Sequence, residues 1–140
     1  MDQLPRFDDL VAVARRARKA RRVLVVLVSQ SDCPYCHLLK EEVLLPMVKG
    51  GDFADEILLG ELFIDEGETV VDFRGRRRPA ADFAHDYEVY VTPTLLFLDA
   101  DGRELADKMV GVNTVEMYFY YLSEAIREAV ARLRGGGREE

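Results

Sequence analysis

An uninterrupted apolar run, Val-Leu-Val-Val-Leu-Val at residues 23–28, constrains the fold more than any other part of the sequence. The run has the length of one strand, and four of its six residues are β-branched valines. A strand with one face in water alternates apolar and polar residues, whereas a strand covered on both faces does not. We therefore expect residues 23–28 to form a central strand.

Both cysteines of the chain, Cys33 and Cys36, follow this run after a short polar segment. Apolar residues then recur at helical spacing from Leu38 to Met47, and Pro34 suits a first helical turn because no N–H is needed there. The pair is thus predicted at a strand-to-helix junction. The positive end of the helix dipole lowers a thiol pKa from its usual value of about 8.5, which favours the attacking thiolate.

Other uses of the cysteines stay open at this point. Residues 33–37 match the Cys-X-X-Cys-His motif of c-type haem attachment, although the predicted strands have no role in a small helical cytochrome. A zinc site would need two more ligands, such as His37 and His85, and His37 diverges from its neighbour on a helix by roughly 100°. Buried structural thiols usually have apolar neighbours, unlike the polar Asp32 here. We favour a redox pair.

The rest of the chain predicts alternating helices and strands, in an α/β order. Helices are predicted over residues 8–20, 34–46, 52–58, 79–87 and 115–133, and strands over 23–28, 61–64, 69–73, 94–98 and 104–110. Asp101-Gly102 is typical of a hairpin turn, so the last two strands should be antiparallel. Asn113, with Glu116 three residues later, predicts a capping arrangement for the final helix.

Composition limits the class of protein. With 140 residues, 49% of them hydrophobic, we expect a single domain over residues 1–134 and a flexible tail over 135–140. A net charge of −7 argues against a general nucleic-acid binder, and the basic residues within 15–22 are expected to form a solvated helix face. No apolar run approaches the roughly 20 residues that span a bilayer, so no membrane insertion is expected.

From about Val23 to the final helix, the sequence resembles the thioredoxin-fold family. The matching motifs are Cys33-Pro34-Tyr35-Cys36 after the apolar strand, Phe63-Ile64-Asp65, Val91-Thr92-Pro93-Thr94, Asp101-Gly102 and Gly111. The resemblance implies a central mixed sheet of about four strands flanked by helices, with a short insertion before the third helix.

The resemblance also implies a substrate site opposite the cysteines. In this family the proline after a threonine or similar residue is cis and faces the pair, so Pro93 would be cis. Thr92 would offer its backbone to an extended substrate peptide, as in strand addition. Pro34 and Tyr35, between the cysteines, would border the same site.

The activity that the resemblance implies is thiol–disulfide exchange, most naturally reduction, with Cys33 attacking and Cys36 resolving. Neither a cofactor nor a metal is expected, because the cysteine pair itself holds the electrons. The expected partners are proteins with thiols or disulfides and a dithiol electron donor, and the protein is expected to be a monomer. The alternative is a non-enzymatic thioredoxin-like module that binds haem or metal through its Cys/His cluster.

The insertion at residues 70–75 is similar to that of thioredoxin-like proteins of bacterial cell envelopes, including those linked to sulfur oxidation. This likeness favours the periplasm, if an export signal has been removed, with the cytoplasm as the alternative; the sequence begins without a signal-peptide pattern.

Some positions depart from the family pattern. Leu27 and Glu61 stand where ordinary thioredoxins carry an aspartate and a lysine near the resolving thiol, and Asp32 replaces a tryptophan. Gly111 stands alone where glutaredoxins have two glycines for glutathione. We therefore expect a protein electron donor rather than glutathione.

Overall fold

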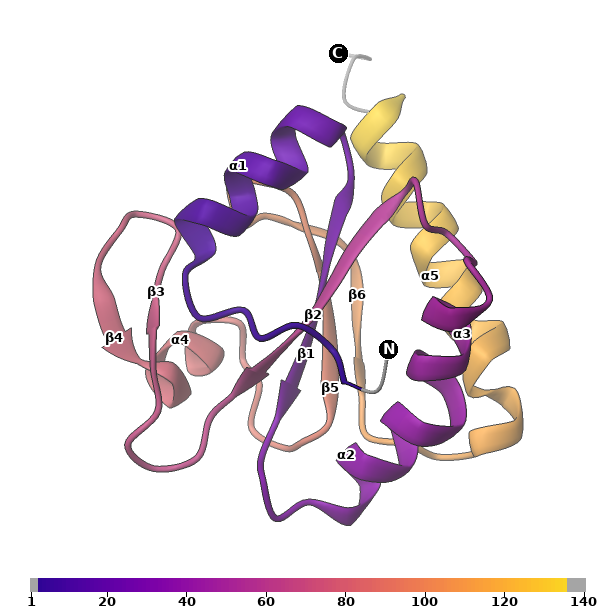
Figure 1. Ribbon diagram of the computed structural model, residues 1–140, viewed down its shortest axis with the longest axis horizontal. Coiled ribbons are helices and arrows are strands. Elements are labelled where there is room, and N and C mark those ends of the chain that lie inside the picture. Colours follow the sequence, from indigo (N-terminus) through magenta and orange to yellow (C-terminus); the bar gives the residue numbers. More distant parts are fainter. Residues whose placement is uncertain (1–2, 136–140) are drawn as a thin grey trace.

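A four-stranded mixed sheet forms the centre of the computed structural model, which describes residues 3–135 (Figure 1). The strands lie in the order β2-β1-β5-β6. Strand β1 (Val23–Ser29) runs parallel to β2 (Ile57–Phe63) and antiparallel to β5 (Thr94–Leu98), and β5 pairs antiparallel with β6 (Glu104–Val110). The predicted α/β class, with a mixed sheet of four strands between helices, is confirmed.

Strand β1 is central, as the apolar run predicts. All seven of its residues are buried. Val23, Val25 and Leu27 belong to the core on one face of the sheet, and the residues between them belong to the core on the other face. The absence of alternation in the sequence therefore reflects burial on both sides.

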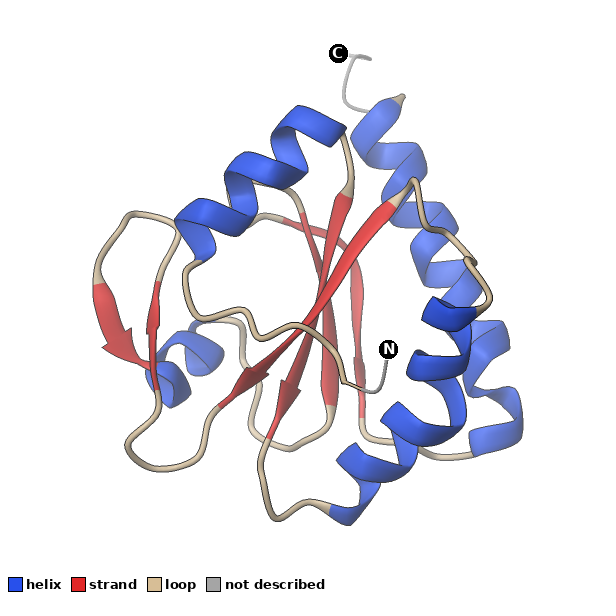
Figure 2. Ribbon diagram, viewed as in Figure 1, coloured by secondary structure: helices blue, strands red, loops and turns tan. Residues whose placement is uncertain are grey.

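Helices cover both faces of the sheet (Figure 2). One core contains residues of α1 (Leu10–Ala20) and α4 (Ala80–Asp86). The opposite core contains residues of α5 (Val115–Arg134) and of the helical segment that follows the cysteines. No helix within residues 3–135 is long and apolar enough to cross a membrane.

The helical segment after the cysteines consists of three parts. Helix α2 (Pro34–Leu39) continues into a π-helical turn, η1 (Lys40–Leu44), and then into α3 (Leu45–Lys49). In the wide turn the N–H of Leu45 donates to the carbonyl of Lys40, five residues earlier. The helix predicted over residues 34–46 does not end at Pro46, which lies in the first turn of α3, where its missing N–H is tolerated.

The predicted insertion before α4 is a hairpin of two short strands. Strand β3 (Thr69–Val71) pairs antiparallel with β4 (Arg77–Pro79). Strand β4 was not among the predicted strands. The carboxylate of Asp72 closes the turn by accepting the backbone N–H groups of Arg74 and Arg76, each at 2.9 Å. Burial alone would raise the pKa of Asp72, but these hydrogen bonds and the nearby guanidinium groups lower it overall.

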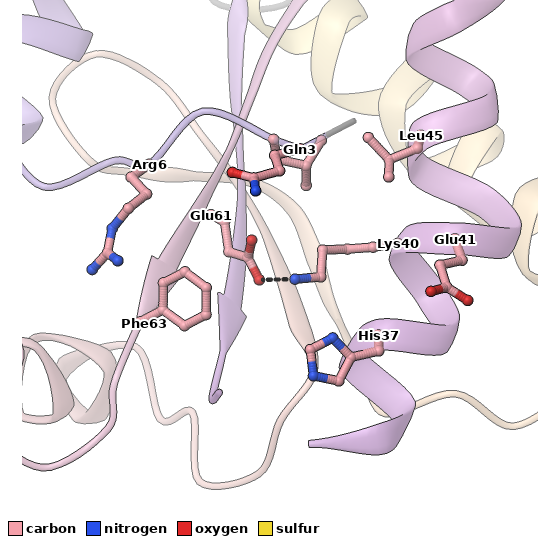
Figure 3. A pocket seen from close by; sticks show the side chains of 9 residues that line it. Gln3, Arg6, His37, Lys40, Glu41, Leu45, Glu61 and Phe63 are labelled. Carbon is pink, nitrogen blue, oxygen red and sulfur yellow. Dashed lines mark ion pairs between the residues drawn. The ribbon is translucent and has the colours of Figure 1, made fainter. Parts of the chain in front are cut away.

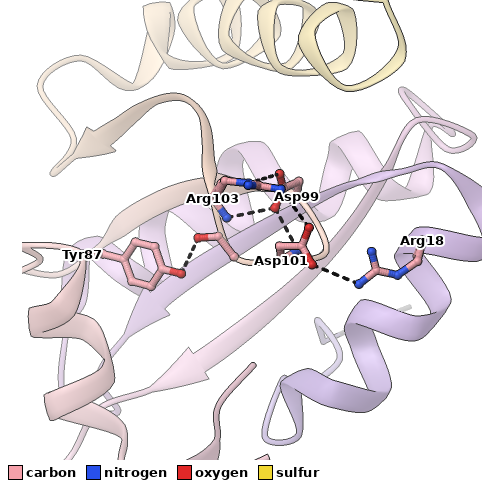
Figure 4. Close-up of polar contacts among 6 residues, drawn as sticks. Arg18, Tyr87, Asp99, Asp101 and Arg103 are labelled. Carbon is pink, nitrogen blue, oxygen red and sulfur yellow. Dashed lines mark hydrogen bonds and ion pairs between the residues drawn. The ribbon is translucent and has the colours of Figure 1, made fainter. Parts of the chain in front are cut away.

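Side chains from three parts of the chain stabilise the predicted hairpin turn between β5 and β6 through hydrogen bonds and an ion pair (Figure 4). Asp99 accepts the N–H groups of Asp101 and Arg103, and Arg18 of α1 pairs with Asp101 at 3.3 Å. The hydroxyl of Tyr87 donates to the carbonyl of Gly102 at 2.5 Å. Gly102 has a φ of 85°, which explains the preference for glycine at this position.

Some local predictions were wrong. Residues 52–56 form turns, not a helix, and β2 begins at Ile57 because its residues pair one by one with those of β1. Helix α5 has Thr114 at its N-cap and no side-chain cap, so Asn113 does not cap it. Helix α1 begins at Leu10, with Asp9 as its cap. The predicted tail over 135–140 lies outside the described residues, except for Gly135.

Candidate active site around the Cys33–Cys36 disulfide

The two cysteines form a disulfide at the start of α2. Cys33 is the N-cap residue, Pro34 follows in the first turn, and the Cα atoms of the cysteines are 5.2 Å apart. The backbone N–H of Cys36 donates to Sγ of Cys33 at 3.2 Å. Cys36 is completely buried, whereas Cys33 retains 8% exposure. Cys33 is thus the more exposed of the two residues, and its sulfur receives a backbone donor.

The loop before β5 lies against this disulfide. The Thr92–Pro93 peptide bond is cis, and Pro93 is buried. The hydroxyl oxygen of Thr92 lies 3.5 Å from Sγ of Cys33. The carbonyl of Pro93 accepts the N–H of Gly111 at 2.8 Å, which joins the end of β6 to the same corner. The structure therefore brings Cys33, Cys36, Thr92 and Pro93 together.

Pro34 and Tyr35 are both exposed on the first turn of α2, and Tyr35 is 60% exposed. Both residues border the disulfide in sequence, and neither is needed for core packing. An aromatic ring exposed beside a reactive sulfur is available for contact with a substrate.

Asp65, two residues after the end of β2, holds the polar loop between β1 and α2. The backbone N–H of Ser31 donates to both carboxylate oxygens of Asp65 at 3.0 Å, and its hydroxyl donates to Oδ1 at 3.3 Å. From the helix side, Nε2 of His37 lies 3.0 Å from the carbonyl oxygen of Ser31. His37 is exposed, but it also contacts this loop. Asp65 was identified only as part of a family motif, so its anchoring role was missed.

A largely buried ion pair lies between β2 and the helical segment that follows the cysteines (Figure 3). Glu61 is 4% exposed and is the β2 partner of Leu27 in the strand register. Its Oε2 atom lies 2.9 Å from Nζ of Lys40, although not in hydrogen-bond geometry. In the sequence, Glu61 is recognisable as a departure from the family pattern, whereas Lys40 is not. The available signal was spacing, because Lys40 follows Cys36 by one helical turn.

This ion pair faces a hollow of about 390 Å³. Its lining combines charged side chains with apolar ones, among them Phe63. The guanidinium of Arg6 lies 4.7 Å from the centre of that ring, a cation–π distance. The hollow lets water approach the outer end of the pair but leaves the Glu61 carboxylate covered.

The metal-site alternative would need further ligands beside the two cysteines. Across residues 3–135, no three side chains from His, Cys, Asp and Glu come together as a metal ion requires. His85 lies next to the ring of Tyr90, with 5.2 Å between the ring centres. Both cysteine sulfurs are joined to each other.

Comparison with known proteins places the chain in a family. Residues 10–126 match the sequence profile of the thioredoxin-like domain. The chain belongs to the thioredoxin-like domain family. No curated protein matches it in sequence.

Several solved structures share the thioredoxin-like fold of this chain. A thioredoxin of Fasciola hepatica has a TM-score of 0.60 at 17% identity, with 90% of this chain and 99% of that chain covered. Mitochondrial thioredoxin 3 of Saccharomyces cerevisiae, in its oxidised form, has a TM-score of 0.58 at 18% identity, with coverages of 89% and 94%. A DsbH oxidoreductase has a TM-score of 0.63 at 15% identity, with coverages of 89% and 85%.

The thioredoxin-like fold, together with the Cys33–Cys36 pair, supports thiol–disulfide oxidoreductase activity in general. The narrower likeness to sulfur-oxidation proteins stays a prediction.

Proposed function

We propose that this thioredoxin-like protein exchanges electrons with protein disulfides, with Cys33 as the attacking residue and Cys36 as the resolving one. The observation that carries the proposal is the asymmetry of the two sulfurs. Cys33 is the more exposed and lies near two donors, the N–H of Cys36 at 3.2 Å and the Thr92 hydroxyl at 3.5 Å. Donors directed at sulfur stabilise the thiolate after reduction.

The reaction has two exchange steps. The Cys33 thiolate attacks one sulfur of the substrate disulfide; the substrate S–S bond breaks, and the departing sulfur takes a proton. Cys36 then loses its proton and attacks Sγ of Cys33, which releases the second substrate thiol and forms the Cys33–Cys36 disulfide. Two electrons have passed to the substrate, and a dithiol protein returns them by the reverse exchange.

Reduction of protein substrates in the cell envelope, by a monomer that needs neither a cofactor nor a metal, is part of the proposal. The likeness of the hairpin insertion to envelope thioredoxin-like proteins supports this setting, and the cytoplasm is the alternative. The backbone around Thr92, beside the disulfide and at the end of the sheet, supports binding of an extended peptide.

Insulin reduction and substrate trapping test this proposal. We expect Cys33→Ser to abolish insulin reduction, and Cys36→Ser to accumulate mixed disulfides with cellular proteins that a reductant releases. The trapped proteins identify the compartment and the direction of exchange. If Cys33→Ser reduces insulin at the wild-type rate, the cysteines have no redox role. Stoichiometric zinc or covalently bound haem in the purified protein would instead favour the binding-module alternative.

A further inference from the structure

Two segments of this acidic chain are strongly basic. Residues 10–22 contain six of its 19 lysines and arginines and no acidic residue, and residues 73–78 contain four more. The first segment is α1 with the two residues that follow it, and the second is the turn of the hairpin insertion with part of β4. More than half of the basic residues are therefore confined to two segments, in a chain whose net charge is −7.

The fold places these two segments side by side (Figure 1). The N–H of Val71 donates to the carbonyl of Asp8 at 3.0 Å, which joins β3 to the chain just before α1. At the hairpin turn, a Cβ on Gly75 would lie 3.9 Å from the side chain of Val11. Backbone pairing and packing of the turn therefore hold the arginines of the hairpin next to those of α1.

Two adjoining hollows, of about 410 and 430 Å³, follow this junction. The first is bordered by α1, the hairpin and the β5–β6 turn, and the second by the hairpin and α4. Phe73 and Asp101 line both hollows, which together form one furrow, called here the arginine furrow. Its five arginines are Arg15, Arg18, Arg74, Arg76 and Arg78.

Two guanidinium groups of the arginine furrow, those of Arg15 and Arg74, form no ion pair within residues 3–135. Both residues are exposed, and they come from opposite sides of the first hollow, α1 and the hairpin. The furrow therefore has a net positive charge and two guanidinium groups available to a carboxylate. The other three arginines form ion pairs with the aspartates of the furrow, which are Asp72, Asp86 and Asp101.

We propose that the arginine furrow binds an acidic segment of a partner protein, an extended stretch of aspartate and glutamate residues. A guanidinium group binds a carboxylate through two parallel hydrogen bonds, so Arg15 and Arg74 can each hold one side chain of such a segment. The half-buried ring of Phe73 adds apolar contact area in both hollows.

The surroundings of the arginine furrow favour a polypeptide over a membrane or a nucleic acid. The arginines line a concave surface, which a thin chain can enter and a flat bilayer cannot. Outside the two basic segments, the chain carries all 26 of its acidic residues and only the remaining nine basic ones. A larger polyanion, such as an anionic bilayer or a DNA duplex, would therefore be repelled by what lies around the furrow.

The arginine furrow lies away from the disulfide. Leu24, near the start of β1, pairs with Leu98 at the end of β5, so the turn that contains Asp101 lies at the end of the sheet where β1 begins. The cysteines follow the other end of β1. A segment bound in the furrow leaves the disulfide accessible, and the inference does not depend on the proposed redox activity.

Fluorescence anisotropy of labelled peptides tests the inference. The probe is a short peptide of glutamate, aspartate and glycine, and its control has glutamine and asparagine in place of the acids. At physiological ionic strength, we expect the wild-type protein to bind the acidic peptide about tenfold more tightly than the amide peptide, because charge-assisted hydrogen bonds are the stronger ones. Added salt should weaken the binding, since exposed charges are screened.

Two double variants that remove the same number of charges locate the site. Arg15→Gln with Arg74→Gln changes the arginine furrow, whereas Arg16→Gln with Lys19→Gln removes two exposed charges of α1 that do not line it. We expect the first double variant to weaken binding of the acidic peptide about tenfold and the second by less than about twofold. Unchanged thermal unfolding confirms that both are folded.

Several outcomes would overturn the inference. The wild-type protein could bind both peptides equally, or neither at concentrations up to about 1 mM. Equal weakening by the two double variants would mean that the peptide responds to general positive charge. Binding of phosphatidylglycerol vesicles or single-stranded DNA as tight as that of the acidic peptide would mean that any polyanion binds. Self-association that Arg15→Gln with Arg74→Gln abolishes, without peptide binding, would mean that a second copy occupies the furrow. Insulin reduction tests the proposed function separately from all of these.

Discussion

The hydroxyl oxygen of Thr92 lies 3.5 Å from Sγ of Cys33 and 3.0 Å from Oε1 of Gln30. One hydroxyl proton cannot serve both acceptors at once. In the disulfide form the amide oxygen is the better acceptor. After reduction the Cys33 thiolate carries a full charge, and hydrogen bonds to charged acceptors are the stronger ones. Reduction should therefore turn the hydroxyl towards sulfur.

Replacing Thr92 with valine tests this hydrogen bond. Valine keeps the branched shape but has no hydroxyl, so the thiolate loses a donor. We expect Thr92→Val to raise the pKa of the Cys33 thiol by about one unit, equivalent to about 1.4 kcal/mol. The pH dependence of the alkylation rate, or of thiolate absorbance, measures the change. Gln30→Ala is the control, and it should lower the pKa or leave it unchanged. An unaltered thiol pKa in Thr92→Val would show that the hydroxyl does not reach the thiolate.

In the Lys40–Glu61 pair each charge should stabilise the other, so removal of one charge alone should destabilise the folded protein. Lys40→Met leaves the Glu61 carboxylate buried without its cation, so we expect it to lower the free energy of unfolding by about 3 kcal/mol, the lower end of the usual range because the adjacent hollow admits water. Lys40→Met combined with Glu61→Leu should recover most of the loss. Urea unfolding of Lys40→Met and of the double variant measures the loss in unfolding free energy and its recovery. A double variant that is no more stable than Lys40→Met would show that the two charges do not interact.

Asp72 should make stability depend on pH in acid. Its pKa is lowered in the folded state, so its contribution is complete above the unfolded value of about 3.9 and is lost as pH falls through the folded pKa. Asp72→Asn cannot titrate. The difference in unfolding free energy between wild type and Asp72→Asn should therefore be constant from pH 7 to about 5 and should shrink below about pH 4. A difference that is the same at pH 3 and pH 6 would contradict this account.

Gly102 and Gly67 provide a matched test of steric room. Both have positive φ, 85° and 90°. A Cβ at Gly102 would lie 2.7 Å from the Phe73 ring and 2.8 Å from the Tyr87 hydroxyl, whereas nothing lies within 4 Å at Gly67. We expect Gly67→Ala to cost about 1 to 2 kcal/mol for backbone strain alone. Gly102→Ala should cost about 2 kcal/mol more, from overpacking. Equal midpoints of unfolding for the two variants would contradict the crowding at Gly102.

Local patterns of apolar residues predicted the main strands of the sheet and the helices that each bury one of their sides. Residues 23–28 and 95–98 are apolar throughout, so an unbroken apolar run of strand length located both strands. The start of β2 was missed because its position is fixed by pairing with β1, a contact between residues far apart in the chain. Strand β4 was missed because Arg77-Arg78-Pro79 has no apolar alternation; hairpin closure through Asp72 defines it.

The candidate site could be predicted where one motif contains its members. Cys33 and Cys36 belong to one motif of four residues. Thr92 and Pro93 were identified through the resemblance to the thioredoxin-fold family. Asp65 and Lys40 could not be assigned their contacts, because each acts on a residue from a different element: Ser31 in one case and Glu61 in the other. Distances between elements depend on how the helix packs against the sheet, which no short pattern encodes.

The helical segment after the cysteines buries side chains at both of its ends. Cys36 and Met47 are both buried, and they are eleven residues apart, close to three turns at 3.6 residues per turn. Leu39, three residues after Cys36, is buried as well. One residue inserted or deleted between Leu39 and Met47 would rotate the two ends against each other by about 100°. The position of the resolving sulfur therefore depends on a core contact three helical turns away.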